Sequence, residues 1–413
     1  MRSLKVLNKY FYKYRLRLGL GVLFVAISVI FGVFPAQFVR ESFNVVQEAI
    51  EGYQNDPQNF DYTDLKKQLI LYGLIIIGSS LLKGLFMFFM RQTIIVVSRY
   101  IEYDMKNEIF EQYQKLSLSF YKRNNTGDLM NRISEDVSRV RMYVGPAIMY
   151  TINVGLSLII IITIMLTINV RLTLFVLAPL PFLAFAIYKV SRKINFHSEK
   201  VQRQLSVISS FVQESFSGIR VLKAYTREED FKKKFKAEND TYFEKNESLY
   251  RINALFFPLM VLLIGLSTIL TVYIGGQEAI AGDITTGNIA EFIIYVNMLT
   301  WPVASIGWVT SLVQRAAASQ ERINEFLSIT PEIQNPTTDE LDLQGNITFE
   351  NVSFTYPDTG IEAIKNLSFK LEAGKSLAII GKTGAGKSTV AQLIGRLYDV
   401  NEGQILIDGK PRE

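Results

Sequence analysis

The sequence contains no cysteine and a single histidine in 413 residues. Without cysteine, the chain can have no disulfide, no catalytic thiol and no cysteine-ligated metal site. A single histidine excludes a histidine-rich metal centre as well. That residue, His197, lies in a basic, polar stretch, and we expect it to have an exposed structural role rather than a catalytic one.

Long stretches of the chain carry almost no charge. Hydrophobic residues make up 49% of the sequence and the mean hydropathy is positive, which is too apolar for an ordinary soluble chain of this length. A membrane-spanning helix needs about 20 mostly apolar residues. Six blocks meet or approach that length: 18–38, 69–90, 147–168, 172–188, 254–274 and 289–312. The fourth is the shortest and carries Pro179 and Pro181. The sequence therefore predicts six membrane spans.

The charges between these blocks are distributed unevenly. Residues 1–17 carry only basic charges, the loop 39–68 is mainly acidic, the segment 189–251 is rich in lysine, and the loop 275–288 has acids but no base. Because positively charged segments stay on the cytoplasmic side, we expect a multi-pass protein of the cell (inner) membrane whose N-terminus and C-terminal region are cytoplasmic. The net charge of +5 then reflects topology and anionic lipid rather than a nucleic-acid partner. The first block is too long for a secretory signal peptide, and we expect it to remain as an anchor.

Residues 381–388 read Gly-Lys-Thr-Gly-Ala-Gly-Lys-Ser, which is a complete P-loop. Ser376–Ile380 before it predicts a short buried strand, and apolar residues after it recur at helical spacing. In such a loop, backbone N–H groups surround phosphates, Lys387 reaches the terminal phosphates and Ser388 ligates Mg²⁺. We therefore expect ATP and Mg²⁺ as cofactors. The residues expected to bind ATP are Gly381, Lys382, Thr383, Gly384, Ala385, Gly386, Lys387, Ser388 and Thr389.

The chain divides into regions of different character. Residues 1–325 predict an α-helical transmembrane domain with long cytoplasmic helices and an N-terminal amphipathic helix on the inner membrane surface; a solvated tail is the alternative for that N-terminal helix. Residues 326–345 form a polar linker interrupted by prolines. Residues 346–413 predict the start of an α/β P-loop ATPase domain, with candidate strands at 347–356, 364–371 and 404–407.

Together these features resemble an exporter-type ABC half-transporter, in which the membrane domain precedes the nucleotide-binding domain. The resemblance rests on the P-loop and on the segments 118–136, 214–225, 353–357 and 388–409. It implies that Tyr356 stacks on adenine, with packing at a strand end as the alternative. It also implies that short coupling helices at about Phe120–Asn125 and Val221–Arg227 dock on nucleotide-binding domains, and that the chain pairs with a second half-transporter, identical or paralogous.

The sequence departs from the family after the P-loop. No glutamine loop, signature motif, Walker B Asp-Glu pair or switch histidine is found between Lys387 and Glu413. We therefore assign no catalytic residue in this chain and expect the reading frame to continue for roughly 150 to 200 residues. Because phosphoryl transfer needs several of these parts together, we expect the 413-residue chain alone to bind nucleotide weakly at best and to show no turnover.

The predicted function is an exporter subunit that couples ATP binding and hydrolysis to outward translocation of a lipid-like or amphipathic substrate. The alternative is an ATP-binding membrane subunit without turnover of its own. Fusion of the two domains in one chain argues against an importer. Lys83 lies in the second span, where a base costs about 2.5–3.5 kcal/mol on insertion scales. It faces a substrate path for anionic or amphipathic cargo, or it snorkels or pairs with a carboxylate such as Glu291.

Overall fold

The computed structural model describes residues 3–55, 57, 62–334 and 342–411. The chain forms two compact units, which we call the sheet unit and the helical unit. The sheet unit comprises Met1–Tyr12, Ser98–Tyr143 and Gln314–Glu413, and the helical unit comprises Lys13–Val97 and Val144–Val313. Each unit is described separately below.

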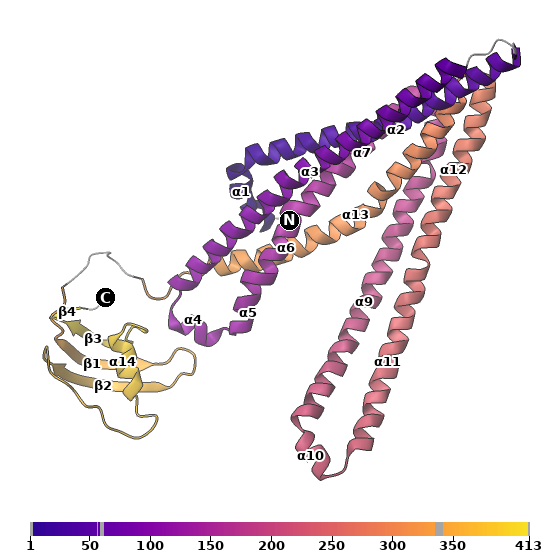
Figure 1. The fold of residues 1–413 in the computed structure, drawn as a ribbon. Coiled ribbons are helices and arrows are strands. Elements are labelled where there is room, and N and C mark those ends of the chain that lie inside the picture. The colour runs from indigo at the N-terminus through magenta and orange to yellow at the C-terminus, as the bar shows by residue number, and fades with distance from the viewer. Residues whose placement is uncertain (1–2, 56, 58–61, 335–341, 412–413) are drawn as a thin grey trace. The chain divides into compact units, whose positions relative to one another are not determined.

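Six helical stretches among the described residues are long and apolar enough to cross a membrane, which confirms the six predicted spans (Figure 1). The spans lie in α2 (Arg15–Asn55), α3 (Tyr62–Lys115), α7 (Ile148–Ile168), α8 (Val170–Leu177) with α9 (Pro179–Ser217), α12 (Phe256–Ala281) and α13 (Thr286–Leu327). The third span is preceded by α5 (Thr126–Asn131), η2 (Arg132–Asp136), α6 (Val137–Met142) and η3 (Tyr143–Ala147), and the fifth by α11 (Glu228–Ala254).

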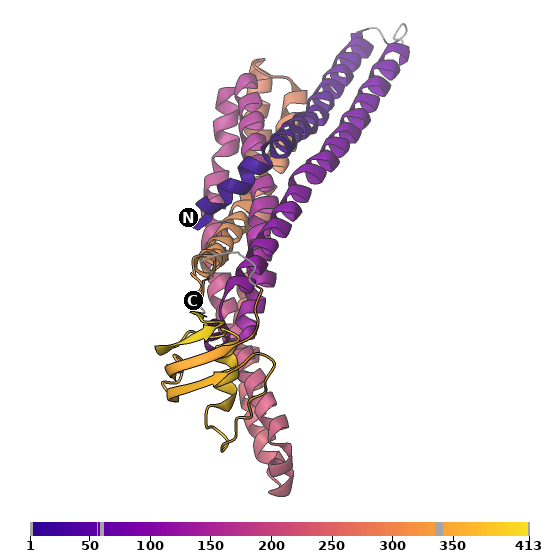
Figure 2. The same cartoon turned by 90° about the vertical axis from the view of Figure 1, so that its left-hand side faces the viewer.

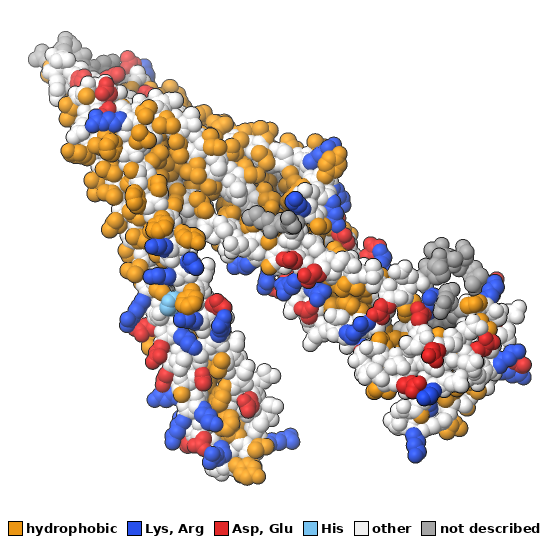
Figure 3. Space-filling view, turned by 180° about the vertical axis from the view of Figure 1, so that it is seen from behind, with side chains coloured by type: hydrophobic (Ala, Val, Ile, Leu, Met, Phe, Trp, Pro, Cys, Tyr) orange, Lys and Arg blue, Asp and Glu red, His pale blue; other side chains and the backbone are white. Residues whose placement is uncertain are grey.

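Several of these helices are much longer than a membrane is thick. Helix α3 has 54 residues, and a rise of 1.5 Å per residue makes it about 80 Å long, against a hydrocarbon core of about 30 Å. The hairpin of α9 and α11 turns at the short helix α10 (Ile219–Ala224). Figure 3 shows that hydrophobic side chains gather over the α12 end of this hairpin and charged side chains over its α10 end. The prediction that the spans continue as polar helices is confirmed.

Helices α2 and α3 form an antiparallel pair joined by aromatic contacts (Figure 2). The rings of Phe31 and Phe86 stack with centroids 5.8 Å apart. Gly21 allows the close approach of α3, because a Cβ atom placed there would lie 2.4 Å from Cγ1 of Ile94.

Asn169 separates the third and fourth spans. It has extended backbone geometry, and its side chain accepts a hydrogen bond of 2.8 Å from the backbone N–H of Leu172, which caps α8. Its amide also donates to Glu278 near the end of α12 at 2.9 Å, and Arg171 pairs with the same carboxylate at 2.8 Å. The connection between these spans is therefore short, as the spacing of the apolar blocks 147–168 and 172–188 indicates, and a buried glutamate anchors it.

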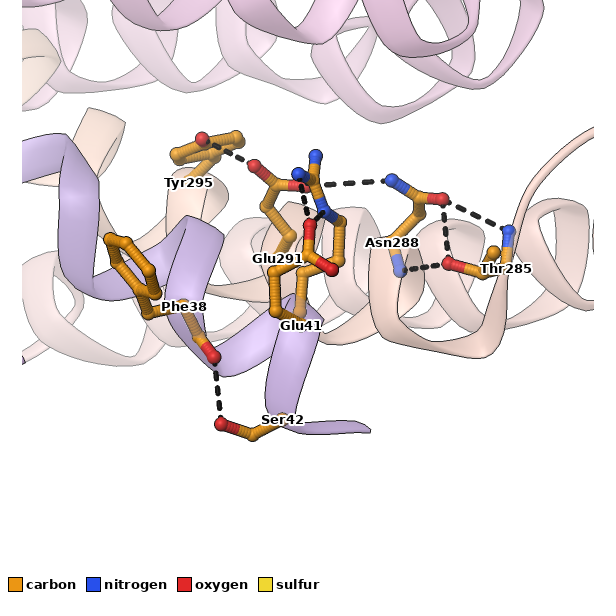
Figure 4. Close-up of polar contacts among 8 residues, drawn as sticks. Phe38, Glu41, Ser42, Thr285, Asn288, Glu291 and Tyr295 are labelled. Atoms are coloured by element: carbon orange, nitrogen blue, oxygen red, sulfur yellow. Dashed lines mark hydrogen bonds and ion pairs between the residues drawn. The ribbon is translucent and has the colours of Figure 1, made fainter. Parts of the chain in front are cut away.

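A second buried glutamate, Glu291, joins the first and last spans (Figure 4). The Glu291 carboxylate accepts hydrogen bonds from the Tyr295 hydroxyl at 2.6 Å and from Arg40 of α2 at 3.2 Å. Arg40 also pairs with Glu41 at 2.6 Å. Tyr295 of this network belongs to an apolar core to which α2, α7, α8, α9, α12 and α13 all contribute.

The N-terminal residues form η1 (Ser3–Leu7) and α1 (Asn8–Lys13), and residues up to Tyr12 belong to the sheet unit. Their apolar side is covered by protein, since Leu7 and Tyr10 are buried. The Tyr10 hydroxyl donates a 2.5 Å hydrogen bond to Glu108 of α3, and Lys9 pairs with the same carboxylate. A solvated tail is therefore wrong for this segment.

The C-terminal part of the sheet unit is a four-stranded antiparallel sheet in the order β2-β1-β3-β4 with α14 (Lys387–Ile394) packed against it. The strands are β1 (Ile347–Thr355), β2 (Glu362–Leu371), β3 (Glu402–Ile407) and β4 (Lys410–Pro411). Phe349 of β1 lies opposite Phe369 and Ile405, and Val390 and Leu393 of α14 join the same core. The three predicted strands and the helix after the P-loop are confirmed. Residues 335–341 of the predicted linker lie outside the described residues.

The predicted strand at Ser376–Ile380 is wrong. These residues have no regular secondary structure, and Ile380 is 93% exposed. An apolar segment forms a buried strand only when neighbouring strands complete its hydrogen bonds on both sides. The described residues place β2, β1, β3 and β4 elsewhere and supply no such neighbours.

Candidate nucleotide-binding site

The P-loop is held in a conformation that requires glycine. Gly384 and Gly386 have φ values of +85° and +80°, in the left-handed region. A Cβ atom at Gly386 would also lie 2.3 Å from the carbonyl oxygen of Ala363 in β2, whereas one at Gly384 would meet open space. The loop therefore packs closely against the sheet at Gly386 and turns directly into α14.

The loop and the first turn of α14 present donors that suit phosphate. The first N–H groups of a helix have no partner within the helix and carry a partial positive charge. The Lys387 ammonium folds over the loop and donates to the carbonyl oxygens of Gly381 at 2.8 Å and Lys382 at 2.7 Å. Ser388 is exposed beside it. These groups fit a nucleotide triphosphate, with the Ser388 hydroxyl available as an oxygen ligand for Mg²⁺.

Thr389 is placed differently from its neighbours in the loop. It is buried, and its hydroxyl lies 2.9 Å from the hydroxyl of Tyr356. The Tyr356 hydroxyl also donates to Gln392 of α14 at 3.0 Å. In this structure Thr389 therefore holds Tyr356 against the P-loop helix.

Tyr356 lies half-buried among aromatic side chains. Its ring is nearly perpendicular to those of Phe354 and Tyr398, with centroids 5.0 and 5.5 Å away. The Lys122 ammonium lies 4.5 Å from the Tyr356 centroid and 5.1 Å from the Tyr398 centroid. The structure thus brings Tyr356 to the P-loop helix and adds a cation from a distant part of the chain.

Two family models match this sequence. A model of the ABC transporter transmembrane region matches residues 18–303, and a model of the ABC transporter matches residues 364–413, which include the P-loop. The chain belongs to the ABC transporter family.

Individual members of the ABC transporter family are similar to the chain over most of its length. It is 30% identical over 309 residues to the probable multidrug resistance ABC transporter ATP-binding/permease protein YheI of Bacillus subtilis, covering 74% of this chain and 53% of that protein. It is 30% identical over 343 residues to an ATP-dependent lipid A-core flippase of Syntrophus aciditrophicus, covering 83% and 56%. The multidrug resistance-like ATP-binding protein MdlA of Escherichia coli is 29% identical over 303 residues, covering 73% and 51%. The chain spans about half the length of these relatives.

Both segments predicted as coupling helices of the ABC transporter are short helices. The first is α4 (Leu118–Arg123), and the second is α10 at the tip of the α9–α11 hairpin. In the sheet unit, Leu118 of α4 packs against the core beneath α14. On its other side α4 contacts Glu332, which follows α13 and accepts hydrogen bonds from Ser119 and Arg123. The hydrogen bond from Ser119, followed by the contact with Arg123, lowers the pKa of Glu332 despite partial burial.

Lys83 does not pair with Glu291, so that prediction is wrong. Glu291 is already engaged by Arg40 and Tyr295. The Lys83 side chain instead lies against Gly32 of α2, where an added Cβ would be 3.2 Å from the ammonium nitrogen. No carboxylate among the described residues forms an ion pair with it. His197, expected to be exposed, is half-buried, with Nδ1 3.0 Å from the Ser248 hydroxyl.

Sequence reasoning missed Gln392, Tyr398 and Lys122 at this site. Gln392 and Tyr398 follow the P-loop closely, so their proximity to it could have been expected from the helix that begins at Lys387. Lys122 lies in the segment 120–125 that was expected to dock on a nucleotide-binding domain, but nothing in the sequence paired it with Tyr356, which it reaches through the packing of α4.

Proposed function

We propose that this chain is a subunit of an exporter-type ABC transporter that binds ATP with Mg²⁺ and couples ATP binding and hydrolysis to outward movement of a lipid-like or amphipathic substrate. The observation that carries the proposal is the P-loop itself, with Gly386 packed against Ala363 and Lys387 folded over the loop. Residues 381–388, with Tyr356, would hold the nucleotide. Thr389 would hold Tyr356 in position through the contact between their hydroxyl groups.

The wider arrangement follows from the same proposal. Residues 1–325 would form the membrane domain, 326–345 the linker and 346–413 the part of the nucleotide-binding domain present here. A second half-transporter would complete the dimer. The basic N-terminus and lysine-rich inner segments support a cytoplasmic nucleotide site in the cell (inner) membrane. Names of relatives that include multidrug resistance and lipid A-core flippase support an amphipathic cargo.

Nucleotide binding is tested by equilibrium titration of the purified chain in nanodiscs with Mg-ATP. Lys387→Met should weaken binding about tenfold or more, because a charge-assisted contact with phosphate is lost. Lys375→Met is the matched control, since this exposed lysine lies outside the loop. Equal affinity of the Lys387→Met variant and the unaltered chain would contradict the proposal.

The alternative is an ATP-binding membrane subunit without its own turnover. An ATPase measurement separates the two. We expect no turnover from these 413 residues alone, and ATP-dependent uptake only by inside-out vesicles that carry the assembled transporter.

Cargo handling by Lys83 is tested in the same vesicles. Because its ammonium lies against Gly32 without a carboxylate partner among the described residues, Lys83→Met should lower uptake of an anionic amphiphile, whereas Lys83→Arg should retain it. Unchanged uptake across anionic and amphipathic cargo would favour snorkelling instead.

A further inference from the structure

The position of Lys122 is fixed by the packing of α4. Leu118 packs into the core of the sheet, and Ser119 and Arg123 contact Glu332 on the other side of the helix. Lys122 is itself exposed, and no carboxylate among the described residues forms an ion pair with it. Its ammonium lies over the rings of Tyr356 and Tyr398 instead, at distances typical of cation–π contacts.

The ring of Tyr356 cannot easily turn away from this contact. Its hydroxyl is held by Thr389 and Gln392, both in the helix that begins at the P-loop. Phe354 and Tyr398 lie beside the ring and are 2% and 5% exposed, so neither can move without opening the core. Among these neighbours of the ring, Lys122 is the exposed side chain, so it can move without opening the core.

We propose that Lys122 and the nucleotide base compete for the ring of Tyr356, so that binding of ATP displaces Lys122 and loosens α4 from the sheet. The inference rests on the proposed function, because it requires adenine to stack on Tyr356 while the P-loop holds the phosphates. Without nucleotide, the contact of Lys122 with the ring of Tyr356 helps to hold α4 on the sheet. With nucleotide, adenine occupies the ring and this contact is lost. The packing of α4 on the sheet therefore depends on the base as well as on the phosphates.

The test compares two ligands of the chain in nanodiscs: Mg-ATP, and Mg-tripolyphosphate, which has no base. Removing the competitor in Lys122→Met should increase the ratio of ATP affinity to tripolyphosphate affinity by about two- to fivefold, the range expected for an exposed cation–π contact. Using the ratio cancels the general effect of removing one positive charge. Lys122→Arg should keep the ratio of the unaltered chain, because a guanidinium also binds an aromatic face.

Arg123→Met is the matched control, because it removes a charge from the same helix but contacts Glu332 rather than the rings. It should leave the ratio unchanged. In a Tyr356→Leu background, Lys122→Met should also have no effect on the ratio. A ratio that is unchanged or lower in Lys122→Met would overturn the competition. If the unaltered chain bound neither ligand, the proposed function would fail and the inference with it.

Discussion

The Arg40 guanidinium lies 3.2 Å from the Glu291 carboxylate, which is completely buried between the first and last spans. The two charges are not equivalent. Arg40 has a second partner in Glu41 at 2.6 Å and is partly exposed, whereas Glu291 has Arg40 as its cation and otherwise neutral donors. Breaking a buried pair by removing one partner costs about 3–5 kcal/mol, because the other charge is left buried and uncompensated.

This asymmetry predicts which substitution is worse. Arg40→Leu should destabilise the helical unit by about 3–5 kcal/mol, whereas Glu291→Gln should cost clearly less, because Arg40 keeps Glu41. Adding Glu291→Gln to Arg40→Leu should recover most of the loss. The measurement is a double-mutant cycle of detergent unfolding; additive effects of the two changes would contradict the pairing.

The P-loop predicts a contrast between two glycines. Gly386→Ala should abolish Mg-ATP binding, because the new Cβ would meet the carbonyl oxygen of Ala363 at 2.3 Å. Gly384→Ala has the same backbone strain, on the order of 1–2 kcal/mol, but open space around it. It should bind nucleotide with a moderate loss of affinity. An equal loss of Mg-ATP affinity in both variants would show that backbone strain, rather than the close contact with β2, determines why glycine is required in the loop.

The contact of Glu332 with α4 predicts a pH dependence. Because hydrogen bonds from Ser119 and Arg123 lower the pKa of Glu332, the stabilisation is fully present above the ordinary glutamate pKa of about 4.3. It is lost as pH falls through the lowered pKa of the folded state. Hydrogen exchange of the α4 amides, corrected for intrinsic rates, should therefore accelerate in acid. In Glu332→Gln the exchange should be faster already at neutral pH and depend less on acid; parallel pH profiles would contradict this.

The membrane topology can be tested by labelling single introduced cysteines, because the chain has no cysteine of its own. Single cysteines at Asn55 and Gln277 should react with an impermeant reagent from outside intact cells, and one at Asn239 should react only after the cells are opened. Gln277 and Asn239 are both exposed in the structure, so the comparison does not depend on burial. Labelling of position 239 from outside would reverse the proposed orientation.

The sequence alone determined the features that depend on local composition and spacing. Six apolar blocks are enough to predict six spans, because the length of an apolar run decides whether a helix can cross a bilayer. The glycine spacing of residues 381–388 predicted a tight loop before a helix, and short apolar segments at 347–356, 364–371 and 404–407 predicted β1, β2 and β3. The brief connection at Asn169 was also visible, since little more than that residue separates two apolar blocks.

Tertiary structure decided the features that depend on contacts between residues far apart in the sequence. Ser376–Ile380 is as apolar as a buried strand, but strand formation requires neighbours that local sequence does not specify. Lys83 and Glu291 are both charged groups in apolar spans, and only packing shows that Glu291 takes Arg40 while Lys83 lies on Gly32. Lys122 meets Tyr356 for the same reason: the contact exists because Leu118 packs into the core beside α14. Hydrophobic periodicity is a property of neighbouring residues, whereas the choice of a partner for a charge or a ring is made by the folded chain as a whole.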